Sequence, residues 1–160
     1  MTYAINNILY STDLGPRSLE VFHHAVGLAA RFQAKLTVVT VIEAAGDYAN
    51  VALDSYVPAD IVAQIRQDGV ARIRENIDAR IAAYQENHPE VDVRGLISEV
   101  KILEGAAADA LLNEAKASGA DMIVLGSHGH TALGEMLIGS VAHKVTMRAQ
   151  VPVVLVPINY

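Results

Sequence analysis

Asp121-Met-Ile-Val-Leu-Gly-Ser-His-Gly129 joins a short apolar run to a glycine-rich loop, and Gly139-Ser140 follows after nine further residues. The apolar run is typical of a buried strand, and a helical pattern begins at Ser140. Glycines let backbone N–H groups approach an anion, and a helix N-terminus adds unpaired N–H donors and a favourable dipole. This segment therefore predicts a phosphate-binding loop. It lacks the Gly-x-x-x-x-Gly-Lys-Ser/Thr pattern, so a nucleotide would be held differently from one in a P-loop.

The composition favours a single domain over residues 1–160, because 52% of the side chains are hydrophobic and can form a core. The net charge of −6, with acidic and basic residues intermixed, argues against a nucleic-acid-binding protein. The absence of cysteine excludes a disulfide framework and a thiolate metal site. No signal-peptide pattern and no bilayer-length apolar run is present, so we expect a cytoplasmic protein that is not embedded in a membrane.

Apolar runs alternate with helical patterns along the whole chain. Strands are expected at residues 8–10, 36–42, 97–103, 122–125 and 153–156, and helices at 18–33, 59–85, 105–118 and 140–148. Ser18 is the expected cap of the first helix, and Leu19, Phe22 and Val26 share its apolar face. This alternation predicts an α/β fold, a doubly wound five-stranded parallel sheet in the order 3-2-1-4-5 with helices on both faces.

The second predicted helix carries a stripe of isoleucines spaced four residues apart. Its members are Ile61, Ile65, Ile73, Ile77 and Ile81. Residues at this spacing lie on one face of a helix, so the stripe predicts a helix with an apolar face.

Two polar segments far apart in sequence converge in this topology. Ser11-Thr12-Asp13 ends the first strand and the loop from Gly126 ends the fourth, at the point where the strand order reverses and ligands bind. Asp13 has a structural alternative as an Asx turn or helix cap, and Ser140 one as a helix cap. For His128 and His130 we expect solvent-facing positions in the loop or polar contacts to phosphate rather than a zinc site, because no further ligands have suitable spacing.

With these features the chain resembles the universal stress proteins, a UspA-like superfamily with an adenine nucleotide α-hydrolase-like fold. The resemblance covers essentially the whole chain. It is carried by Ile8-Leu-Tyr-Ser-Thr-Asp13, by Val39-Thr-Val-Ile42, by Gly126-Ser-His-Gly129-x9-Gly139-Ser140 and by Val151-Pro-Val-Val-Leu-Val-Pro157. The glycine spacing is the signature of the members that bind ATP. Ser11 is a small departure, since many relatives have proline or a small apolar residue there.

The resemblance implies a role for each matching position. Asp13 would face the adenosine portion, and it is the nearest candidate for contact with a Mg or Mn ion that is bound mainly through the phosphates. The backbone of Val41 would meet adenine. Gly126 and Gly129 would line the ribose and phosphates, and Gly139, Ser140 and the Val141 amide would clamp the phosphates. The predicted binding set is completed by Ser11, Thr12, Gly105, Leu125 and His128.

The fifth strand has apolar side chains on both faces and lies at an edge of the predicted sheet. An exposed apolar edge strand is an aggregation hazard unless it is covered or paired. The resemblance also implies dimers through this strand. We therefore expect a homodimer through Val151 to Val156, with higher oligomers left open.

The sequence features bear on three functional classes. The leading one is an ATP-binding regulatory module that acts on a transporter or a metabolic enzyme, because the phosphate loop contains no lysine and no acid–base pair is evident. The alternative is a slow ATPase or nucleotide hydrolase. An FMN-binding redox module is disfavoured by the scarcity of large aromatic residues near the loops. The related ATP-pyrophosphatases carry a Ser-Gly-Gly-x-Asp-Ser loop that is missing here.

Overall fold

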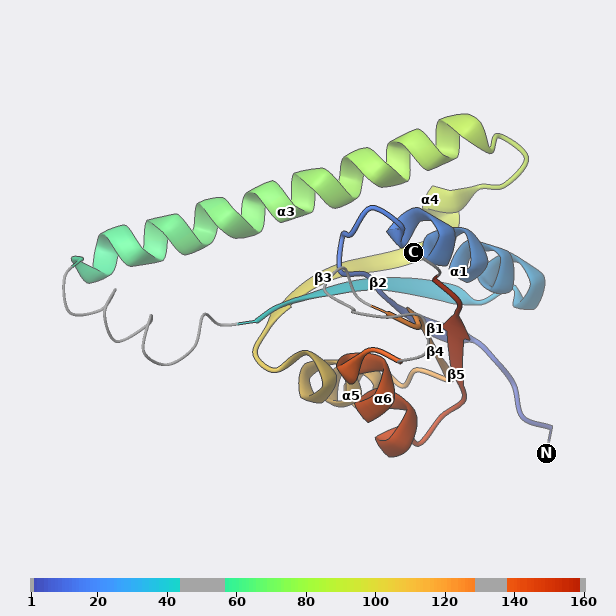
Figure 1. The fold of residues 1–160 in the computed structure, drawn as a ribbon. Coiled ribbons are helices and arrows are strands. Elements are labelled where there is room, and N and C mark those ends of the chain that lie inside the picture. The colour runs from blue at the N-terminus through green and yellow to red at the C-terminus, as the bar shows by residue number, and fades with distance from the viewer. Residues whose placement is uncertain (1, 44–56, 129–137, 159–160) are drawn as a thin grey trace.

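Five parallel strands form the centre of the part of the chain that the computed structural model describes, residues 2–43, 57–128 and 138–158 (Figure 1). They are β1 (Asn7–Ser11), β2 (Lys35–Ile42), β3 (Ile97–Glu104), β4 (Met122–Gly126) and β5 (Val153–Val156). Their order is β3-β2-β1-β4-β5, and every neighbouring pair is parallel. The predicted fold class and strand order are confirmed.

Helices cover both faces of the sheet (Figure 1). Helices α1 (Ser18–Phe32), α3 (Ala59–Asn87) and the short α4 (Val93–Leu96) lie on one face, and α5 (Ala107–Ala117) and α6 (Ser140–Arg148) lie on the other. The four long helices match the expected ones, whereas α4 was not predicted. None of the helices in the described ranges is both long enough and apolar enough to cross a membrane.

The central strand β1 contributes to the core on both faces of the sheet. Ile8 and Tyr10 pack with α1 and α3, and Leu9 packs with α5 and α6. Successive side chains of a strand point to opposite faces, so a strand that is covered on both sides must be apolar at every position. This explains why the run 8–10 carries no alternation of polar and apolar residues.

The start of α1 differs from the prediction. Ser18 is the first helical residue rather than the cap, and its hydroxyl donates a hydrogen bond to the Gly15 carbonyl (2.9 Å). Phe22 and Val26 are buried as expected, but Leu19 is 53% exposed. Leu19 lies in the first turn of the helix at the edge of a cavity between α1 and α3, which leaves much of its side chain uncovered.

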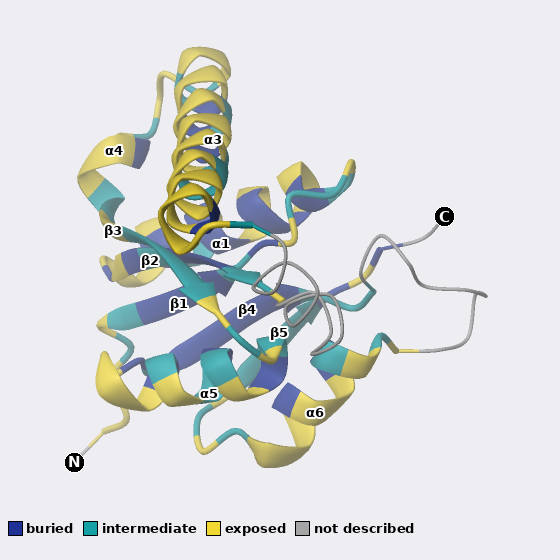
Figure 2. Cartoon of the chain, turned by 90° about the vertical axis from the view of Figure 1, so that its left-hand side faces the viewer, coloured by how far each residue is buried: buried dark blue, intermediate teal, exposed yellow. Residues whose placement is uncertain are grey.

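The isoleucine stripe of α3 is buried over only part of its length. Ile77 and Ile81 are buried and Ile73 packs against the same core, whereas Ile61 is 47% exposed and Ile65 is 57% exposed. The face that these isoleucines share is therefore covered only towards the C-terminal end of the helix. A helix of 29 residues is about 44 Å long, and an eight-residue strand spans about 26 Å. The N-terminal half of α3 extends beyond α1 (Figure 1) and is exposed around much of its circumference (Figure 2).

Candidate functional site

A cavity of about 410 Å³ lies at the carboxyl ends of β1 and β4, where the strand order reverses. Ten of the predicted binding residues line it: Ser11, Thr12, Asp13, Val41, Leu125, Gly126, His128, Gly139, Ser140 and Val141. The two polar segments that were expected to converge do so here. The remaining lining residues, which the sequence did not indicate, are Tyr10, Ser18, Val21, Ala107, Leu111, Ile138, Ala142 and Ile158.

Two predicted residues stand apart from this set. Gly105 does not line the cavity. Its φ of 126° is accessible mainly to glycine, and its N–H donates to the Ile42 carbonyl (3.1 Å), so it forms the turn from β3 towards α5. Gly129 lies outside the described residues, as does His130, and their predicted roles stay predictions.

The segment after β1 is fixed to the sheet by backbone and hydroxyl hydrogen bonds. The Thr12 N–H donates to the Val39 carbonyl (2.9 Å), and the Thr40 hydroxyl donates to the Thr12 carbonyl (2.8 Å). Thr40 is buried, so its hydroxyl requires this partner. These bonds hold Thr12 against β2 at the edge of the cavity.

Asp13 forms the Asx turn that was considered as its structural alternative. Its Oδ1 accepts a hydrogen bond from the Gly15 N–H (2.8 Å), and the Leu14 N–H donates to the Thr12 hydroxyl (3.0 Å). A carboxylate has two oxygens with about four acceptor positions. The turn therefore does not by itself prevent Asp13 from contacting a ligand or a cation in the cavity that it lines.

The loop after β4 is tied to both β5 and the start of α6. The Ser127 N–H donates to the Val156 carbonyl (2.9 Å), the Gly139 N–H donates to the Ser127 carbonyl (2.8 Å), and the Ile158 N–H donates to the Ser127 hydroxyl (3.0 Å). Ser127 thus connects the end of β4 with the N-terminus of α6. The sequence contains no signal for this role, because each partner is remote along the chain.

Gly126 lines the cavity and leaves room for the side chains of Ile158 and Val21. A Cβ at this position would lie 2.4 Å from Cδ1 of Ile158 and 3.2 Å from Cγ2 of Val21. An alanine would displace the terminal methyl group of Ile158. The resemblance implied a contact with ribose or phosphate here, and the structure adds a packing reason for the same glycine.

His128 lines the cavity and contains a buried polar atom. Its Nδ1 lies 2.9 Å from the Ser127 hydroxyl, whereas its Nε2 is buried and has no hydrogen-bond partner among the residues that the structure describes. Leaving a buried donor or acceptor unpaired costs about 1–3 kcal/mol. Since His128 lines the cavity, a polar group of a ligand there would remove this cost.

Helix α6 begins at the edge of the same cavity. Gly139 occupies the N-cap position without a side-chain cap, and the first internal bond runs from the His143 N–H to the Gly139 carbonyl (2.8 Å). The amides of Ser140, Val141 and Ala142 come before that bond and so have no partner within the helix. Unpaired N–H groups and the helix dipole favour an anion at this end. Ser140 follows the cap, so its alternative role as the cap is wrong.

Tyr10 connects β1 to the start of α1. Its hydroxyl donates a hydrogen bond to the Ser18 carbonyl (3.0 Å). Burial raises the pKa of Tyr10 to about 12. The phenol therefore stays neutral near pH 7 and acts as a hydrogen-bond donor within the fold.

The ionisable side chains that line the described cavity are Tyr10, Asp13 and His128. Within residues 2–43, 57–128 and 138–158, no three His, Asp or Glu side chains lie close enough together to hold a metal ion. From Gly126 to Ser140 the sequence contains no lysine. The anion-binding features of the site are thus backbone amides and one imidazole.

Comparisons with known proteins agree with this architecture. A model of the universal stress protein family matches residues 4–157. Universal stress protein YxiE of Bacillus subtilis (strain 168) is 32% identical over 156 residues, which cover 94% of this chain and 98% of that protein.

Solved structures show the same fold. Universal stress protein UspA from Lactobacillus plantarum has a TM-score of 0.73 at 22% identity, with 97% of this chain and 99% of that chain covered. A universal stress protein solved in complex with cAMP is 28% identical and has a TM-score of 0.58, with 96% and 97% covered. The family match and the similarity to YxiE along almost its whole length show that this chain belongs to the universal stress protein family.

Proposed function

We propose that this protein binds ATP, together with Mg or Mn, in the cavity between β1 and β4, and acts as a nucleotide-responsive regulatory module. The observation that carries the proposal is that one cavity is lined both by the N-terminus of α6 and by His128, whose buried Nε2 has no partner in the described part of the chain. The volume of about 410 Å³ lies within the usual range of about 300–1,000 Å³ for small-molecule sites.

The residues divide by chemistry along the proposed nucleotide. Adenine would contact the apolar residues Val41 and Leu125. The phosphates would accept hydrogen bonds from backbone amides in the segment Gly139-Ser140-Val141. Gly126 lines the cavity and Gly129 belongs to the same glycine pattern. The relative solved in complex with cAMP supports an adenine nucleotide as the ligand class, since it is 28% identical over nearly the whole chain.

The cation in this proposal is held mainly by phosphate oxygens. Magnesium commonly uses one or two carboxylates and completes its shell with phosphate and water. Asp13 lines the cavity and is the proposed protein contact for the ion. The ion would neutralise phosphate charge in a site that contains no lysine between Gly126 and Ser140.

A regulatory role fits these side chains better than efficient hydrolysis. Catalysed phosphoryl transfer depends on cationic groups around the transferred phosphoryl and on a residue that positions the nucleophile. Among the described residues that line the cavity, Asp13 and His128 are the ionisable side chains available for these tasks, because Tyr10 stays neutral near pH 7. The alternative, a slow ATPase, would show ADP release that disappears in Asp13→Ala. The partner in this proposal is a transporter or a metabolic enzyme.

Dimerisation through β5 is part of the same proposal. The strand lies at one edge of the sheet, and Val153, Val154 and Leu155 are only partly buried. Pairing with a second copy would satisfy the outward backbone groups and cover these side chains. Sedimentation of the purified protein as a dimer at micromolar concentration is expected. A monomer under those conditions would refute the dimer.

The nucleotide proposal is tested by identifying what the purified protein carries. The protein is denatured and the released small molecules are identified by mass spectrometry. An adenine nucleotide is expected, at a level that falls in Val141→Pro, which removes one of the N-terminal amides of α6. Release of a different ligand class, or equal nucleotide from the variant, would contradict the assigned site.

A further inference from the structure

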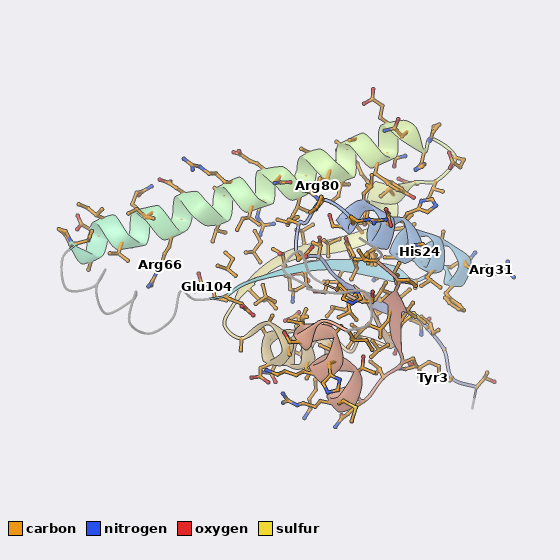
Figure 3. The ribbon with its side chains drawn as sticks, in the orientation of Figure 1. Tyr3, His24, Arg31, Arg66, Arg80 and Glu104 are labelled. Carbon is orange, nitrogen blue, oxygen red and sulfur yellow. The ribbon has the colours of Figure 1, made fainter. Side chains whose placement is uncertain are left out.

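Arg80 of α3 reaches across to the loop that joins β1 to α1, residues 12–17 (Figure 3). Its Nη2 donates to the Leu14 carbonyl (2.9 Å), and its Nη1 donates to the Gly15 carbonyl (3.3 Å) and the Ser18 hydroxyl (2.5 Å). We infer that Arg80 is a positioning residue for the candidate nucleotide site, because it holds this loop in the conformation that presents Asp13 to the cavity. The inference builds on the proposed function but can be tested separately from it.

The loop needs such a restraint. Leu14 has a φ of 59°, in the left-handed region where the Cβ of an ordinary residue crowds the following carbonyl oxygen. A leucine keeps this conformation only where its surroundings impose it. The Asx turn of Asp13 supplies one restraint inside the loop. Arg80 supplies the restraint from outside, on the carbonyls of Leu14 and Gly15.

Two cavities border the start of the loop. A second cavity of about 290 Å³ lies between α1 and α3, and Tyr10, Thr12 and Ser18 line both this cavity and the candidate site. Thr12, at the start of the loop, therefore borders both cavities. Arg80 lines the second cavity, and its hydrogen bonds to Leu14, Gly15 and Ser18 connect the loop and the start of α1 to α3.

The chemistry of arginine suits this task. The Arg80 Nε donates to the Asn76 Oδ1 one turn earlier on α3 (2.8 Å), which orients the guanidinium plane. A planar guanidinium reaches several acceptors at once, whereas a lysine ammonium is a single point on a flexible stem. All the acceptors given for Arg80 in the described structure are neutral oxygens. Its effect on the loop therefore depends on the geometry of its donors as well as on its charge.

The test compares Arg80→Lys and Arg80→Gln with wild type. Arg74→Gln is the matched control, because Arg74 lies on the same helix and makes one exposed hydrogen bond, to the Val100 carbonyl (3.3 Å). Two quantities are measured. The first is the NMR hydrogen-exchange rate of the Leu14 and Gly15 amides in the nucleotide-free protein, relative to the amides of β1 and β2. The second is the dissociation constant for MgATP by calorimetry.

Both Arg80 variants are expected to exchange the Leu14 and Gly15 amides about tenfold faster and to bind MgATP about tenfold more weakly, with the strand amides and Arg74→Gln unchanged. Wild-type behaviour of Arg80→Lys would overturn the inference, because charge alone would then suffice. Unchanged exchange in both variants would also overturn it. If wild type binds no nucleotide, the proposed function fails, and the exchange rates still decide whether Arg80 holds the loop. If Arg80→Gln does not fold, Arg80→Lys decides both measurements.

Discussion

At the scale of single residues, His128 shows how the site is built. One ring nitrogen contacts Ser127 within the loop, and the other is buried without a partner among the described residues. A fold that keeps an unpaired buried nitrogen loses stability there, and a ligand that pairs with it regains the loss. Substitutions can distinguish the contributions of the two ring nitrogens. Asparagine reproduces the position of Nδ1, and glutamine extends towards the position of Nε2.

We expect His128→Asn to weaken MgATP binding about tenfold, because it keeps the contact to Ser127 and removes Nε2. His128→Gln, which retains a polar atom near the Nε2 position, is the matched control and should bind more tightly than His128→Asn. Calorimetric titration of the two variants measures the difference. Equal affinities in both variants and in wild type would show that Nε2 does not contact the nucleotide.

Tyr10 gives a second prediction, through pH. Burial raises the pKa of Tyr10 to about 12, so the folded protein retains the phenolic proton to higher pH than the unfolded chain, whose tyrosines titrate near 10. The stabilisation is fully present below pH 10 and is lost as the pH rises through 12. This stabilisation amounts to about 3 kcal/mol, because the pKa of Tyr10 is about two higher in the folded protein than in the unfolded chain. Urea unfolding at pH 9 to 11.5 should therefore show a smaller decline in stability for Tyr10→Phe than for wild type. Parallel declines would contradict the assignment.

At the scale of elements, sequence patterns predicted the positions of helices and strands better than they predicted which side chains are buried. The runs 8–10 and 122–125 were recognisable as strands because they are apolar without alternation, as the core on both faces requires. The isoleucine spacing predicted α3, but periodicity reports only which side chains share a helix face. Whether Ile61 and Ile65 are buried depends on the reach of α1 and the sheet, which no local pattern contains.

This difference within α3 is open to measurement. Ile77→Ala should lower the free energy of unfolding by about 2–5 kcal/mol, because the side chain is 2% exposed in the core. Ile65→Ala, the matched control on the same stripe, should change it by less than about 0.5 kcal/mol. Urea denaturation of both variants provides the values. A large loss in Ile65→Ala would show that the N-terminal half of α3 is packed against something in solution.

At the scale of the whole molecule, the topology places the site. Strand order reverses between β1 and β4, and ten of the predicted residues meet in the cavity there. Those residues could be predicted because they follow strand ends and carry a glycine pattern. Arg80, Ser127 and Ile158 could not, since their roles come from contacts between residues that lie 12 to 66 positions apart in the chain. Gly105 was assigned to the site, but it forms the turn that follows β3.

The central claim is that this cavity binds ATP, and thermal unfolding of nucleotide-stripped protein with MgATP tests it most directly. A ligand at about 100 times its dissociation constant stabilises the folded state by about 2.7 kcal/mol. For a chain of 160 residues this corresponds to a rise in Tm of about 5–10 °C. We predict such a rise with MgATP, and a much smaller one in Val141→Pro. An unchanged Tm at millimolar MgATP would contradict the account.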